Sequence, residues 1–171
     1  MIASFALMSL SLLTVHAHPD DESSKGAGTV RLYSSQGIRT TLVCCTGGEV
    51  GDILNPAMDS PEVKENLASV RQAELDSAAA IIGYDEVVML GYRDSGMPDS
   101  EANNHPDAFA NADLDVAIGK LVEVIRRVRP QVVMTYPEVQ NRYPHPDHLQ
   151  VTAISIPAYE RAGDPSWYPE S

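Results

Sequence analysis

The stretch SLLTVHAHPDDES, residues 11–23, decides the fold of this chain. It begins as an apolar, β-branched run, which predicts a buried strand, and Pro19 then stops further strand pairing. The acids from Asp20 to Glu22 suit the first turn of a helix, because negative charge is favourable at the positive end of the helix dipole. A buried strand that leads directly into a helix is typical of a parallel α/β sheet.

The polar end of this stretch lies where open α/β sheets bind ligands, at the carboxyl end of a strand. His18 and Asp21 are three residues apart across the turn, so both side chains can meet at one point as two ligands of a metal ion. Asp20 stands beside them and could act as a base. The rest of the chain must then supply a third ligand.

Strands and helices alternate along the whole chain. The apolar face of the long helix after residue 61 includes Val63, Leu67, Val70, Ala78 and Ile82. Alternation of this kind predicts a Rossmann-like, three-layer α/β/α domain with a largely parallel sheet, spanning residues 1–171 as one unit. Composition and periodicity predict further strands at 39–45, 86–90 and 131–136, and helices at 21–36, 62–82, 113–128 and from 146 to about 159.

The net charge of −12 argues against nucleic acid or an anionic membrane as a partner, since both require a basic surface. The apolar N-terminus lacks Lys or Arg before Lys25, so it does not read as a secretory signal. It is also too short to span a membrane. We interpret its second half as the first strand; the first several residues are either an extension of that strand or an irregular start.

The two cysteines, Cys44 and Cys45, are neighbours in a predicted strand, so their side chains should point to opposite faces of the sheet. We expect both to be buried structural thiols rather than metal ligands. They offer no disulfide framework, which fits a reducing compartment such as the cytoplasm.

The third ligand is expected from the segment after the last strand, which reads Tyr143-Pro144-His145-Pro146-Asp147-His148. Pro146 fits the first position of a helix. His145 and His148 are three apart, so one or both could turn toward His18 and Asp21. Two histidines and one carboxylate with open positions suit catalytic zinc, and also non-haem iron(II).

His105 is followed by Pro106 and Asp107, so it has the same His-Pro-Asp sequence as the two clusters. It has no preceding strand to direct its side chain, so we expect a surface or helix-capping role for it.

The motifs HPDDE (residues 18–22) and HPDH (residues 145–148), in this order and each after a strand, resemble the zinc-dependent N-deacetylase superfamily. This superfamily includes the de-N-acetylase of N-acetylglucosaminyl-phosphatidylinositol, the PIG-L or LmbE-like type. Within it, residues 16–25, 46–49 and 53–59 look most like the mycothiol S-conjugate amidases. Family members continue beyond this length, so we expect the C-terminal part of the family fold to be absent here.

The resemblance implies that His18, Asp21 and His148 hold zinc and that Asp20 is the general base. It also implies a small-molecule substrate of the glucosaminyl-inositol type, and it leaves the oligomeric state open.

The resemblance further implies that Tyr143 and His145 face the scissile carbonyl. The positions that in the family touch the sugar or its polyol are matched by Glu49, Arg71 and Asp94. Without the resemblance, Arg71 would read as a helix-surface charge and Glu49 as a loop carboxylate.

Two neighbouring residues are expected to support the site. Asp147 should orient a histidine. His16, one step inside the strand from His18, should be a buried, hydrogen-bonded histidine rather than a ligand.

The chemistry that follows is hydrolysis of a carboxamide on a glucosamine nitrogen, with Asp20 taking a proton from the attacking water. Tyr143 or a protonated His145 would stabilise the oxyanion, and Asp20 or His145 would return the proton to the amine. The acyl group is an S-substituted N-acetylcysteine in a conjugate amidase and acetate in a deacetylase, and the motif serves both.

Two remote alternatives belong to other classes. The facial triad of iron oxygenases has the same ligand types, but those enzymes resemble all-β barrels rather than an α/β alternation. A non-catalytic remnant would have no need of Asp20 beside the metal.

Overall fold

The computed structural model describes residues 10–141 and 143–170. Within them a four-stranded sheet has the order β3-β2-β1-β4, and every neighbouring pair is parallel. This confirms the predicted parallel sheet. Residues 1–9, where an extension of the first strand was considered, lie outside the described residues. The strands are β1 (Ser11–His16), β2 (Arg39–Thr46), β3 (Glu86–Tyr92) and β4 (Val132–Met134).

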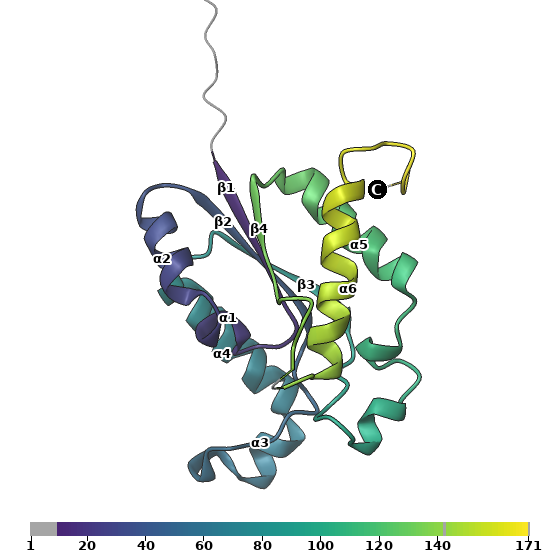
Figure 1. Ribbon diagram of the computed structural model, residues 1–171. Helices are drawn as coiled ribbons and strands as arrows, with labels where there is room; N and C mark the ends of the chain where they lie inside the picture. Colours follow the sequence, from purple (N-terminus) through teal and green to yellow (C-terminus); the bar gives the residue numbers. More distant parts are fainter. Residues whose placement is uncertain (1–9, 142, 171) are drawn as a thin grey trace, which may run out of the picture.

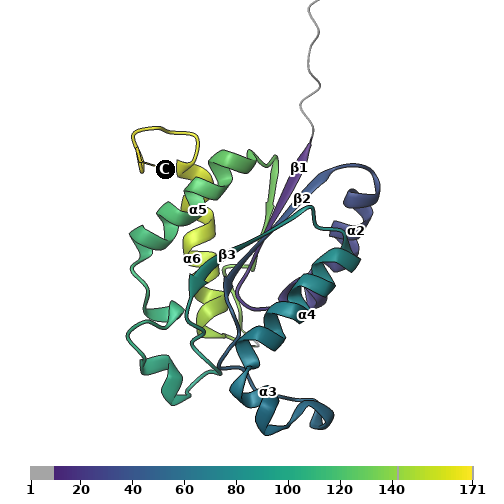
Figure 2. The same cartoon turned by 180° about the vertical axis from the view of Figure 1, so that it is seen from behind.

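Helices cover both faces of the sheet, as Figures 1 and 2 show from opposite sides. One face carries α1 (Asp21–Ser24), α2 (Ala27–Ser35) and α4 (Leu67–Ile82); the other carries α5 (Leu114–Val128) and α6 (Pro146–Arg161). The three-layer α/β/α prediction is therefore confirmed. The connections contain α3 (Pro61–Glu65), η1 (Pro56–Met58), η2 (Glu101–Asn104) and η3 (Phe109–Asn111).

Two helices predicted as continuous are each divided. The helix expected over 21–36 is broken at Gly26, whose φ of 92° is left-handed and ends the helical run. The helix expected over 62–82 is broken at Asn66, with φ −118° and ψ 21°, and the Asn66 side-chain amide donates to the Glu62 carbonyl (2.9 Å). Both breaks come from backbone conformations that helical periodicity does not report.

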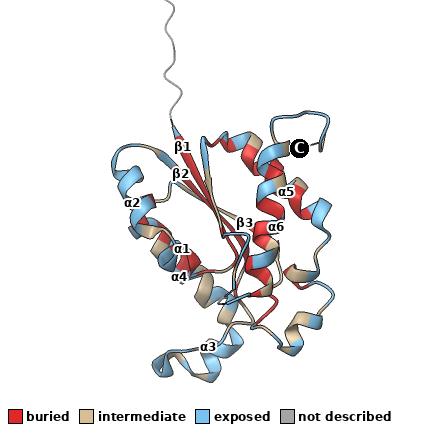
Figure 3. Cartoon of the chain, in the orientation of Figure 1, coloured by how far each residue is buried: buried red, intermediate tan, exposed pale blue. Residues whose placement is uncertain are grey.

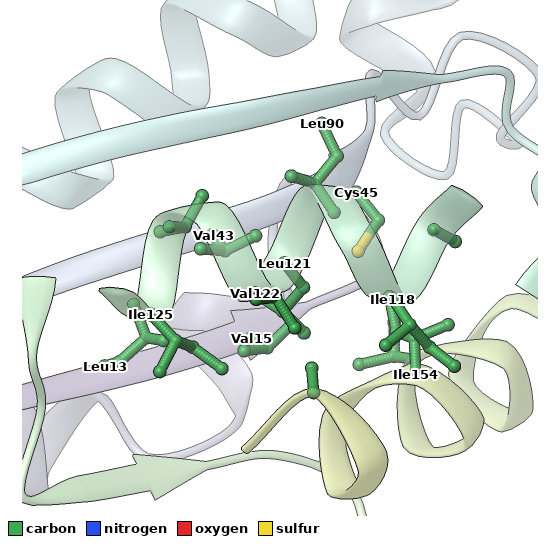
Figure 4. Packing of buried hydrophobic residues seen from close by; sticks show 14 of the residues in the cluster. Leu13, Val15, Val43, Cys45, Leu90, Ile118, Leu121, Val122, Ile125 and Ile154 are labelled. Carbon is green, nitrogen blue, oxygen red and sulfur yellow. The ribbon is translucent and has the colours of Figure 1, made fainter. Parts of the chain in front are cut away.

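The core follows the alternation of the central strands. Leu13, Val15, Val43 and Cys45 point toward α5 and α6, and Figure 4 shows them packed against that helix layer. The alternate residues point to the other face, where the buried clusters contain Leu12, Leu42 and Cys44. The two cysteines are buried, free and on opposite faces, as predicted.

Figure 3 shows the buried residues concentrated in the central strands and in the inner faces of α5 and α6. All six residues of β1 are buried, so the strand is held rigidly through the middle of the domain. Its carboxyl end is therefore a fixed platform for the residues that follow. Among the described residues, no helix combines the length and the apolar character that crossing a bilayer requires.

Candidate functional site

The four parallel strands end at one edge of the sheet, the lower edge in Figure 1, and the segments after them meet there. His18 follows β1, Gly48 follows β2 and Asp94 follows β3. The loop after β4 leads to His145 and His148 at the start of α6. All five residues line one cavity of about 270 Å³. The expected convergence at the carboxyl edge is confirmed.

Two of the predicted ligands, His18 and His148, both lie next to an oxygen of the third, Asp21. Oδ2 of Asp21 lies 3.4 Å from His18 Nδ1 and 3.4 Å from His148 Nε2. Zinc bonds to nitrogen and oxygen are about 2.0–2.2 Å long, and the edge of a tetrahedron with such bonds is about 3.4 Å. The donor types and these two separations therefore fit zinc.

Two groups of described residues have ligand atoms that all lie within 4.8 Å of one another, and neither group contains Asp21. In one, His145 replaces Asp21, and the ligand atoms of His18, His145 and His148 lie within 4.8 Å of one another. In another, His18 is grouped with Asp94 and Asp147. Nδ1 of His145 already accepts the amide of residue 147 (3.2 Å), which leaves this histidine only Nε2. The set with Asp21 is the one that the two motifs predict, and its two separations of 3.4 Å from Asp21 Oδ2 match a tetrahedral edge.

Asp147 orients the first of these histidines. Its side chain is fully buried, and Oδ2 lies 3.0 Å from His18 Nε2. The same carboxylate accepts the backbone amide of Ser95 (3.0 Å) and the Ser95 hydroxyl. A histidine that gives one ring nitrogen to a carboxylate presents the other to a metal in a fixed direction. The predicted contact of Asp147 with a histidine is present, and that histidine is His18.

The electrostatics favour a cation at this point. Burial lowers the pKa of His18, but its contacts with Asp147, Asp21 and Asp94 prevail and raise the pKa to about 11. Burial raises the pKa of Asp21, while His148, His18 and Lys25 outweigh it and hold that pKa well below its usual range. The converging carboxylates would stabilise a metal cation in the same way as they stabilise a charged imidazole.

Asp20 has an unusual backbone conformation, with φ 96° and ψ −24°, in a region that residues other than glycine seldom adopt. Its carboxylate projects to the cavity rim and is 71% exposed. Arg71 donates to Asp20 Oδ2 (2.8 Å) and to the Pro19 carbonyl. The predicted base is therefore held by a guanidinium from α4, and Arg71 also lines the cavity.

Gly48 gives this arginine its space. A Cβ at Gly48, whose φ is 65°, would lie 3.0 Å from Arg71 Nε and 3.2 Å from Pro19 Cδ. The glycine pair after β2 was interpreted as allowing close approach to a ligand or as a plain tight turn. The structure shows that a side chain of the protein makes the close approach.

The remaining predicted substrate residues differ in position. Asp94 is buried and lines the cavity, with Oδ1 3.5 Å from His18 Nε2. Glu49 lies behind it: Glu49 Oε1 accepts the Asp94 backbone amide (3.0 Å), and Glu49 is outside the set of described residues that line this cavity. Its visible contact is thus with Asp94, which it helps to position.

Tyr143 and His145 both line the cavity, as expected for groups that face a substrate carbonyl. Tyr143 is 48% exposed, and its hydroxyl contacts Met97 Sδ at 3.4 Å. Burial, followed by the nearby His18 and His148, lowers the pKa of His145 to about 4.

Two residues at the centre were missed in the sequence. Tyr136 donates its hydroxyl to Asp21 Oδ2, and its ring stacks on His148 at 4.3 Å between centroids. Lys25 Nζ donates a hydrogen bond to Asp21 Oδ1 (2.5 Å), and Lys25 lines the cavity. Both could have been found, because Tyr136 ends a predicted strand at the carboxyl edge and Lys25 stands four residues after Asp21 on a helical segment.

The other two histidines are not part of the cavity wall. His105 is partly exposed, with 42% of its side chain accessible, and its Nδ1 accepts the Asp107 amide (3.2 Å), which agrees with the predicted surface role. His16 is buried as predicted, and burial lowers its pKa to about 4. The expectation that it is hydrogen-bonded is wrong for the described part of the chain, where neither ring nitrogen has a partner. It packs edge-on against Tyr136 instead.

Known proteins resemble this chain over most of its length. The family model for GlcNAc-PI de-N-acetylase, PIG-L, matches residues 13–159. A mycothiol S-conjugate amidase from Streptomyces coelicolor is 47% identical over 165 residues, covering 95% of this chain and 56% of the relative. A 1D-myo-inositol 2-acetamido-2-deoxy-alpha-D-glucopyranoside deacetylase from Acidothermus cellulolyticus is 48% identical over 160 residues, covering 90% and 54%.

Among solved structures, the N,N'-diacetylchitobiose deacetylase from Pyrococcus horikoshii superposes with a TM-score of 0.74 at 22% identity. The match covers 94% of this chain and 53% of the deacetylase, and it supports the fold. The chain thus spans about half the length of the relatives that it matches.

Proposed function

This chain belongs to the GlcNAc-PI de-N-acetylase family, PIG-L, and we propose that it is a zinc-dependent hydrolase cleaving a carboxamide on a glucosamine nitrogen. The substrate that we propose first is a mycothiol S-conjugate. Deacetylation of an N-acetylglucosaminyl-inositol is the alternative, because relatives with each name are almost equally similar. The parallel α/β sheet gives no support to an oxygenase of the all-β class.

The observation that carries the proposal is the arrangement around Asp21 Oδ2. His18 and His148 each approach that oxygen at 3.4 Å, and Asp20 stands at the rim of the same cavity. A binding site alone has no need of an exposed carboxylate held beside a metal position. A base next to a candidate metal ion is the arrangement that amide hydrolysis by water requires.

Bound to His18, Asp21 and His148, zinc would polarise the amide carbonyl and lower the pKa of a water molecule. Asp20 accepts one proton as the water oxygen bonds to the carbonyl carbon. The carbon–nitrogen bond then breaks, and the same proton passes from Asp20 to the leaving amine. The products are a carboxylic acid and a free glucosamine amine, so one water is consumed for each amide.

The remaining groups bind the substrate or orient the residues that react with it. Tyr143 and His145 line the cavity, and Tyr143 would donate its hydroxyl to the oxygen on which negative charge develops. Asp94 offers a buried carboxylate to sugar hydroxyls, and Arg71 fixes the direction of Asp20. Glu49 acts through its bond to the Asp94 amide.

The test is release of primary amine by the zinc-loaded chain from two substrates with the same amine part, a mycothiol S-conjugate and N-acetylglucosaminyl-inositol. Preferential release from the conjugate supports the amidase, and preference for the acetylated sugar moves the assignment to the deacetylase. Asp20→Asn, which keeps the size of the side chain, should abolish release while one zinc stays bound. Absence of release from both substrates by a chain that binds zinc would overturn the proposal.

A further inference from the structure

A second cavity, of about 340 Å³, adjoins the candidate active site. The two cavities share four wall residues, Asp20, Asp52, Leu54 and Arg71. The carboxylate and guanidinium that face the reaction therefore also form one end of the second cavity. A substrate whose amide lies at the metal position could extend past Asp20 into this space.

The rest of the wall is mainly apolar. It comes from the segment after residue 52, from α3 and from one face of α4, where Leu67, Val70 and Ala78 follow helical spacing. The apolar side chains that line it include Ile53, Met58, Val63, Leu67, Val70 and Ala78.

The sequence predicts these residues of α3 and α4 on one apolar face together with Ile82, but of that face Ile82 is the residue that is buried in the core. The buried residues of α4 are Leu75, Ala79 and Ile82; Leu75 and Ile82 pack in the two clusters on this face of the sheet, and Leu75 also borders the cavity. Val63, Leu67 and Val70 are only half-buried. A half-exposed apolar stripe that opens beside a polar site is typical of a pocket that accepts an apolar group.

The two cavities differ in chemistry. The first is lined by His18, Asp94 and His145 among other polar groups, which suits a polyol amine. The wall of the second cavity also has polar residues of its own, Glu22, Ser23, Asn55 and Glu74, but its apolar stripe offers no hydrogen bonds to sugar hydroxyls, and burying those hydroxyls against it is costly. A substrate with one polar and one apolar end would therefore place them in different cavities.

We infer that the second cavity binds the apolar substituent on the acyl side of the substrate, the group attached to sulfur in an S-conjugate. The inference rests on the proposed function and adds a specificity site to it. Acetate is too small to reach past Leu54, so the cavity contributes to cleavage of conjugates and not to deacetylation. Transfer of an aromatic ring from water into such a wall gains about 1.5–3 kcal/mol, at least tenfold in affinity.

The test compares two amides of one glucosaminyl-inositol amine, one carrying acetyl and one carrying N-acetyl-S-benzylcysteinyl. Val70→Asp places a charge in the cavity wall, and Ala78→Phe fills it. Each should lower kcat/KM for the benzyl conjugate about tenfold or more and leave that for the acetylated sugar within about twofold. Ala73→Asp is the matched control, because Ala73 is exposed on the same helix outside the cavity wall.

A binding measurement separates the cavity from the chemistry. Calorimetry with N-acetyl-S-benzylcysteine, the acid that hydrolysis would release, should show binding to the wild-type chain that Val70→Asp weakens and Ala73→Asp does not. Binding of this acid without turnover of either amide would contradict the proposed function but would still support the cavity as the binding site of the apolar group. If Val70→Asp behaves like the wild type and like Ala73→Asp, either in the cleavage of the two amides or in binding of the acid, the inference is overturned.

Discussion

The buried carboxylate of Glu22 accepts the backbone amide of Asp20, with Oε2 2.8 Å from the nitrogen. Glu22 is 1% exposed, and its other oxygen accepts the Ser23 hydroxyl at 2.6 Å. The bond spans the residue whose φ is 96°, so Glu22 stabilises the conformation that turns Asp20 toward the cavity. Backbone strain of this kind persists only where surrounding contacts hold it.

Glu22→Ala should therefore lower the free energy of unfolding by about 0.5–1.5 kcal/mol, since it leaves a part-buried amide without its acceptor. Amine release should fall as well, because Asp20 loses its fixed direction. Glu22→Gln keeps an acceptor oxygen and should be the milder change. Glu65→Ala, at an exposed position, is the control for denaturant unfolding. Equal stability of the Glu22→Ala chain and this control would show that the contact is unimportant.

The backbone of Asp20 predicts an inverted order of stability between two variants that both remove the carboxylate. Asp20→Gly should be more stable than Asp20→Ala by about 1 kcal/mol, because only glycine adopts a positive φ without penalty. In an ordinary helical position alanine would be the more stable. Both variants should lose amine release by at least about a hundredfold. Thermal unfolding of the pair tests the first expectation, and a more stable alanine variant would contradict it.

Asp147→Asn should weaken zinc affinity about 10–100-fold, because a neutral amide orients His18 less firmly than a carboxylate. Asp107→Asn is the matched control: this residue also follows a His-Pro pair, and its side chain is 82% exposed. Zinc titration against a competing chelator measures both. Identical affinities for the two variants would rule out a role for Asp147 in metal binding.

The choice between Asp21 and His145 as third ligand can be tested directly. Asp21→Ala should abolish binding of one zinc per chain, whereas His145→Ala should keep the stoichiometry and lose turnover. His105→Ala should change neither. Metal analysis after dialysis gives the stoichiometry. Loss of zinc in His145→Ala with retention in Asp21→Ala would assign the site to the three histidines.

Tyr84 predicts a pH dependence away from the site. Burial raises its pKa to about 12, and its hydroxyl lies 2.9 Å from Thr14 Oγ1. In the unfolded chain a tyrosine titrates near pH 10, so the fold prefers the protonated form. The stabilisation of the fold by protonated Tyr84 is complete below about pH 10 and is lost as the pH rises toward about 12.

Tyr84→Phe should remove this part of the alkaline loss of stability. At neutral pH the same variant should be less stable by about 1 kcal/mol, because Thr14 loses its partner. Tyr33→Phe, at an exposed position, is the control. Parallel stability profiles of wild type and Tyr84→Phe above pH 10 would contradict the assignment.

Local spacing was enough to predict much of the site. His18 and Asp21 meet because three residues across one helical turn bring two side chains together, whatever the rest of the chain does. His148 could be placed with them because parallel strands end at one edge, so residues after β1 and β4 must be neighbours. His105 could be set aside for the same reason, since no strand directs it.

Other parts of the site depend on contacts between distant segments. Asp147 could have oriented any of three histidines, and its choice of His18 joins residues 129 positions apart. Tyr136 reaches Asp21 across 115 positions. Of the apolar face on α4, Leu67, Val70 and Ala78 line a cavity, whereas Ile82 packs in the core. Periodicity is a property of neighbouring residues, whereas the direction of a side chain at a segment end depends on what packs against it.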